Sequence, residues 1–73
     1  MDDKTLQRKL NQMVKLGNEL DAEAKRRYGQ DALLFHEGDG GLLIMEQLTL
    51  FGDQNKNVRF SAEGVVQWGA GAF

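Results

Sequence analysis

The sequence predicts an α+β fold in which one long N-terminal α-helix packs on a four-stranded antiparallel β-meander. Apolar residues recur at helical spacing over residues 3–28, whereas the later apolar runs are short and separated by polar, glycine-containing segments. One of the nine glycines lies in residues 3–28, and the other eight follow in residues 29–73. Because 73 residues are enough for one domain only, we expect residues 1–73 to form a single unit.

The helix is expected over about residues 3–28. Asp2 and Asp3 suit its N-terminus, basic residues fill its last turn, and Gly29 can take the positive φ angle of a residue beyond a helix end. A break at Gly17–Asn18 is the alternative, but the apolar face keeps its phase across it. This face follows a 4-3-4-3-4 spacing: Leu6, Leu10, Met13, Gly17, Leu20 and Ala24.

The strands are expected at about residues 32–37, 42–51, 58–62 and 65–70. The third alternates, with Val58 and Phe60 on one face. The second does not alternate cleanly, because Glu46 interrupts its apolar positions. Either a bulge near Glu46–Gln47 resets the register, or both faces of the sheet are partly covered, which requires another subunit.

The expected core joins the helix to the sheet. Leu10, Met13 and Leu20 are predicted to contact Phe60 and Trp68, or neighbours on the same face, because these are the clearest apolar faces in the chain.

Composition excludes several classes of chemistry. The chain has no cysteine and one histidine, so disulfides, iron–sulfur clusters and thiolate zinc sites are not expected, nor is any cofactor. The net charge of -2 gives no general attraction to nucleic acid or to an anionic membrane. The run Leu42–Met45 is too short to span a bilayer, and the charged N-terminus does not resemble a signal peptide. We therefore expect a cytoplasmic protein without a membrane partner.

No residue pattern predicts catalysis. His36, Glu37 and Asp39 gather near a turn, but alternation sends His36 and Glu37 to opposite faces and no second histidine completes a metal site. The glycines of Gly38–Gly41 lack the lysine and following helix of a phosphate-binding loop. We therefore expect no catalytic, metal or cofactor residue, and no enzyme.

The predicted function is a small non-enzymatic protein-interaction module, an accessory protein of a kind common in bacteria and phage, that forms a homodimer. A thin core without disulfides or metal needs stabilisation from elsewhere. Leu43, Met45 and Phe51 lie opposite the strand face that the helix should cover. A helix of about 39 Å also exceeds strands of about 17–34 Å, which would leave Leu6 and Leu10 uncovered.

The alternative function is nucleic-acid binding through the basic cluster Lys25–Arg27. Lys25, Arg26 and Arg27 could combine with Lys56 and Arg59 into a phosphate-binding patch. The competing interpretation is an ordinary solvated helix C-terminus, where cations complement the helix dipole.

Overall fold

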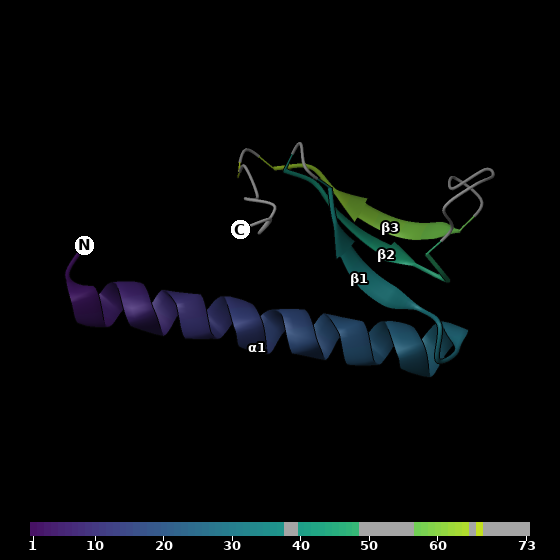
Figure 1. The fold of residues 1–73 in the computed structure, drawn as a ribbon, viewed down its shortest axis with the longest axis horizontal. Helices are drawn as coiled ribbons and strands as arrows, with labels where there is room; N and C mark the ends of the chain where they lie inside the picture. The colour runs from purple at the N-terminus through teal and green to yellow at the C-terminus, as the bar shows by residue number, and fades with distance from the viewer. Residues whose placement is uncertain (38–39, 49–56, 65, 67–73) are drawn as a thin grey trace, which may run out of the picture.

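The computed structural model describes residues 1–37, 40–48, 57–64 and 66. Its elements are α1 (Asp3–Tyr28), β1 (Leu33–His36), β2 (Leu42–Met45) and β3 (Val58–Ala62). The strands form one antiparallel sheet in the order β1-β2-β3. The sheet stands over the C-terminal half of α1 (Figure 1). The predicted α+β class and long N-terminal helix are confirmed.

Helix α1 runs without interruption for 26 residues, so the alternative break at Gly17 does not occur. At its start, the Asp2 side chain accepts a hydrogen bond of 2.8 Å from the Thr5 N–H. At its end, Gly29 has φ 107° and its N–H donates to the Lys25 carbonyl at 3.0 Å. Both ends follow from local sequence, since a side-chain oxygen caps the first N–H groups and glycine tolerates positive φ.

Strand β2 is shorter than the predicted 42–51. It ends at Met45, and a bend follows at Glu46–Gln47, where the sequence predicted a bulge within one long strand. The Glu46 N–H donates to the Asn57 carbonyl at 2.8 Å, outside β2. Residues 49–51 of the predicted strand lie outside the described residues.

The register shift lies between β2 and β3. Ile44 lies opposite Phe60, whereas Met45 lies opposite Val58, so Arg59 is the extra residue. Residues directly opposite each other share a face of the sheet. Phe60 therefore shares the face of Ile44, and Val58 shares that of Met45. The prediction that Val58 and Phe60 lie on one face is wrong, because an unpaired residue between them reverses the alternation.

The buried core is small. Among the described residues, the buried hydrophobic side chains are Ala24, Ala32 and Met45. Leu20 reaches the sheet, as predicted, since it lines a hollow with Ile44 and Phe60. Met13 also reaches the sheet, since it lines a cavity with Leu34 and Leu42, although it is about half exposed. Leu10 is 55% exposed and lines no such cavity among the described residues, so the predicted core extends one turn too far along the helix. Trp68 and the predicted fourth strand, apart from Val66, lie outside the described residues.

The molecule is elongated. It measures 43 × 25 × 24 Å, and its radius of gyration is 13.9 Å, against about 11 Å for a compact domain of 73 residues. Helix α1 causes the elongation, because its N-terminal half extends past the sheet (Figure 1). We call residues 3–16 the projecting segment. Its 14 residues span about 21 Å.

Candidate interaction surface

Polar contacts attach the sheet to the C-terminal half of α1. The Asp21 carboxylate accepts a hydrogen bond of 2.9 Å from the Leu34 N–H. The Lys25 ammonium donates to Asp21 at 2.7 Å and to the Ala32 carbonyl at 2.8 Å. The hydrogen bond from Lys25 and that from the Leu34 N–H hold the pKa of Asp21 below its ordinary value. These contacts commit one half of α1 to the sheet and leave the projecting segment to one side.

The projecting segment carries large apolar side chains that the chain itself does not cover. They continue along the helix to Leu20, where the sheet begins to cover them. Their exposed fractions lie between 45% and 59%. We call this set the apolar stripe: Leu6, Leu10, Met13, Val14, Leu16 and Leu20.

The apolar stripe leads into a cavity of about 340 Å³ between α1 and the sheet. Gly17 lies at its floor, and a Cβ atom built there would be 3.7 Å from Leu34 Cδ2. A Cβ atom at this distance would make an ordinary van der Waals contact, so β1 approaches the helix here without requiring glycine. The cavity is lined by Met13, Leu16, Gly17, Leu20, Leu34, His36 and Leu42.

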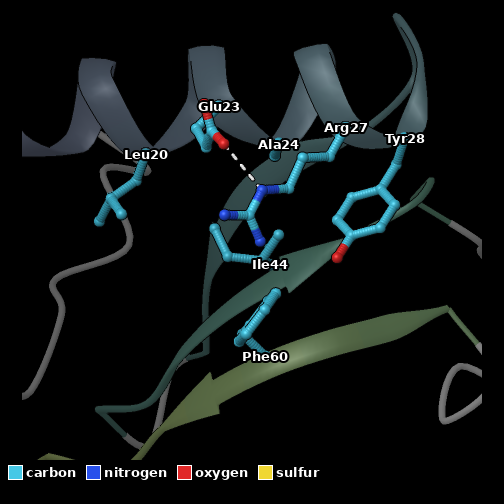
Figure 2. Close-up of a pocket in the computed structure, with 7 residues that line it drawn as sticks. All are labelled: Leu20, Glu23, Ala24, Arg27, Tyr28, Ile44 and Phe60. Carbon is cyan, nitrogen blue, oxygen red and sulfur yellow. Dashed lines mark hydrogen bonds and ion pairs between the residues drawn. The ribbon is translucent and has the colours of Figure 1, made fainter.

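A second hollow, of about 270 Å³, continues the apolar surface toward the C-terminus of α1 (Figure 2). Leu20 points into it from the helix, and Ile44 and Phe60 face it from the sheet. The Arg27 side chain extends across it, with its guanidinium carbon 5.8 Å from the centre of the Phe60 ring. Phe60 is still about half exposed. The apolar surface thus includes part of the sheet as well as the helix.

The contact predicted on the sheet face cannot use Met45, its central residue. Met45 is only 1% exposed, so its side chain is covered within the single chain. It lies on the middle strand, between Leu33 and Val58. Leu43 is half-buried, and Phe51 lies outside the described residues. Among the described residues, exposed apolar area is therefore concentrated on the helix, where Leu6 and Leu10 are open.

The basic cluster at the end of α1 is engaged by acidic residues of the same helix. Glu23 accepts hydrogen bonds from Arg26 Nε at 2.8 Å and from Arg27 Nε at 2.7 Å. These two guanidinium groups lower the pKa of Glu23 to about 2. Since Lys25 is held by Asp21, all three cations of the cluster already have a carboxylate partner.

Arg59 is engaged in the same way. Its Nε donates to a Glu46 carboxylate oxygen at 2.9 Å, and its guanidinium lies 5.6 Å from the centre of the Tyr28 ring. Lys56 lies outside the described residues. The structure therefore brings Arg59 near the end of the helix as part of an ion pair.

His36 ends β1 and lies at the mouth of the cavity. Its ring stacks on Phe35, with centroids 6.2 Å apart and an interplanar angle of 15°. Asp39 lies outside the described residues. In the part of the chain that the structure describes, no three His, Cys, Asp or Glu residues group as metal ligands. Within the same part, no helix has the length and apolar character needed to cross a bilayer.

Val14 and Leu16 widen the periodic apolar face of the helix. One contribution to this surface was not assigned from the sequence. Asp21 connects the helix to β1, and its only sequence signal was the four-residue spacing to Lys25.

Comparisons with protein-family models, with curated proteins and with solved structures found no match to the chain.

Proposed function

We propose that this chain is a non-enzymatic protein-interaction module that binds another protein chain through the apolar stripe. The observation that carries the proposal is the exposure of six large apolar side chains along one side of α1, each by at least 45%. Contiguous exposed apolar surface on a small protein commonly marks a contact with another chain.

The energetics favour burial of the stripe. Fully burying one Leu or Met side chain is worth about 1.5–3 kcal/mol, and Leu6, Leu10 and Leu16 have more than half of that gain still unrealised. A helix that presents anchors every three or four residues is a recurrent way to engage a groove or a second helix. The non-enzymatic part of the proposal rests on the sequence, which lacks a nucleophile beside a base.

Site-specific photo-cross-linking tests this function. A photoreactive phenylalanine analogue at Leu10 should give protein adducts in concentrated pure protein or in a lysate of cells that express the chain. The matched control is the same analogue at Lys15, which lies on the opposite side of the helix. Adducts at Leu10 but not at Lys15 would support the proposal. Equal labelling at both positions, or no adduct at either, would contradict it.

A further inference from the structure

We propose that the partner is a second copy of this chain, and that the two projecting segments pack antiparallel, side by side, across a two-fold axis near Leu10. This inference rests on the proposed function, because it names the occupant of the same apolar stripe. The cavity beside Gly17 of each copy then receives the first helical turn of the other.

The surface area of the chain supports a second copy. The chain exposes 6170 Å². The scaling of area with mass gives roughly 4,500 Å² for a monomeric protein of 8.2 kDa. The excess is about 1,600 Å². A standard interface covers about 800 Å² on each partner, which is less than this excess.

The spacing of the stripe indicates a helix as the occupant. Leu6, Leu10, Met13, Gly17 and Leu20 alternate intervals of four and three residues, which is the spacing of a coiled-coil seam. From Gly17 onward the chain's own sheet covers this seam in part, and Leu34 lies against Gly17. Before Gly17 the seam is open. The open part therefore has the apolar spacing of one helix of a coiled-coil pair.

The shape of the molecule selects the antiparallel arrangement. The sheet stands on the side of α1 that carries the seam, over the C-terminal half of the helix, and the projecting segment continues past it (Figure 1). A parallel pair would bring two sheets against each other at the same end. An antiparallel pair places them at opposite ends.

Three of the five charges in the projecting segment lie away from this pairing. Lys4, Arg8 and Lys15 lie on the side of the helix away from Leu10 at 100° per residue, so they stay in solvent when the stripe is covered. Asp3 lies in the first turn, and Lys9 falls between Met13 and Leu16 at the edge of the seam, where its flexible stem can carry the ammonium group to solvent. The residues at the centre of the seam carry no charge.

Single-cysteine variants test the arrangement, because the natural chain has no cysteine. Disulfides require Cα atoms within about 7 Å. Leu10→Cys should form a disulfide-linked dimer under mild oxidation. Met13→Cys should not, because its two copies would be about 9 Å apart along the axis. An equimolar mixture of Met13→Cys and Leu6→Cys chains should again form linked dimers, because these two positions lie about 1.5 Å apart along the axis in the antiparallel pair. Lys15→Cys, on the outer side, is the matched control and should stay unlinked.

The outcomes distinguish failure of the antiparallel dimer from failure of the proposed function. Linking of Met13→Cys to itself as readily as Leu10→Cys would show a parallel pair and overturn the antiparallel arrangement. A wild-type chain that sediments as a monomer at about 0.1 mM would overturn the second copy as the partner. In that case, photo-adducts at Leu10 with a different protein would still support the proposed function, and their absence would reject both. Circular dichroism of each variant checks that it is folded.

Discussion

The Asp21 carboxylate and the Leu34 N–H, thirteen residues apart in sequence, form a hydrogen bond of 2.9 Å that joins α1 to β1. The same carboxylate pairs with Lys25, which in turn binds the carbonyl of Ala32. One side chain thereby orients the first strand on the helix. The position of the sheet, and with it the length of the projecting segment, depends on this contact.

Asp21→Asn should lower the free energy of unfolding by about 1 kcal/mol, measured by urea denaturation. The substitution removes the charge that Lys25 and the Leu34 N–H engage, while helix propensity changes little. The expected loss of unfolding free energy is small because the Asp21 side chain is 39% exposed. The matched control is Glu19→Gln on an exposed position of the same helix, with an expected change below about 0.5 kcal/mol. Equal losses in the two variants would show that Asp21 is not a structural contact.

Acid should destabilise the chain between about pH 4.5 and pH 2. The pKa values of Asp21 and Glu23 lie below their ordinary values of 3.8 and 4.5, and that of Glu23 is about 2. The unfolded chain therefore binds more protons in this range, so stability is present above it and is lost as the pH falls. Urea midpoints at pH 5 and about pH 2.5 measure the change. The double variant Asp21→Asn, Glu23→Gln should show a smaller fall than the natural chain, and an equal fall would contradict the assignment.

Gly40→Ala should be more destabilising than Gly29→Ala. Both glycines have positive φ, 101° and 107°, so alanine is strained at either position. At Gly40 a Cβ atom would also lie 2.5 Å from the Val66 carbonyl oxygen and 2.8 Å from that of Gly64, whereas the space at Gly29 is open. We expect a loss above about 2 kcal/mol at Gly40 and about 1 kcal/mol at Gly29. Similar thermal unfolding midpoints in the two variants would argue against close packing at Gly40.

The chain should bind single-stranded or duplex DNA no more tightly than about 0.1 mM at physiological salt. The cations Lys25, Arg26 and Arg27 are already paired with carboxylates of the same helix, so little positive potential is left for phosphates. Fluorescence anisotropy with a labelled oligonucleotide measures this. Micromolar binding that falls steeply with salt and is lost in Arg26→Ala, Arg27→Ala would restore the nucleic-acid alternative.

The helix was predictable because its determinants are local. The cap at Asp2, the stop at Gly29 and the apolar spacing all lie within a few residues of the structure they specify. The projection of the helix past the sheet was also predictable, because the helix is longer than the strands. The ion pairs of Glu23 with Arg26 and Arg27 follow the three- and four-residue spacing of a helix face.

The pairing of the strands was less predictable. The extra residue Arg59 is defined only when β3 lies against β2, and it reverses the face of Val58. The burial of Met45 depends on its position in the middle strand, which alternation within one strand does not reveal. The exposure of Leu10 and Met13 depends on where the sheet lies along α1, which a contact between Asp21 and Leu34 fixes.

The sheet packs against the C-terminal half of helix α1, and this determines the order in which the turns of the helix form. An isolated helix of fewer than about 12–15 residues is marginal in water, because its first turn is costly to nucleate. In a single chain, the turns of the projecting segment are added to helix already formed beside the sheet. Amide protection against hydrogen exchange should therefore decrease steadily from Ala24 toward Leu6, and the cap at Asp2 should be the last part of the helix to form and the first to open.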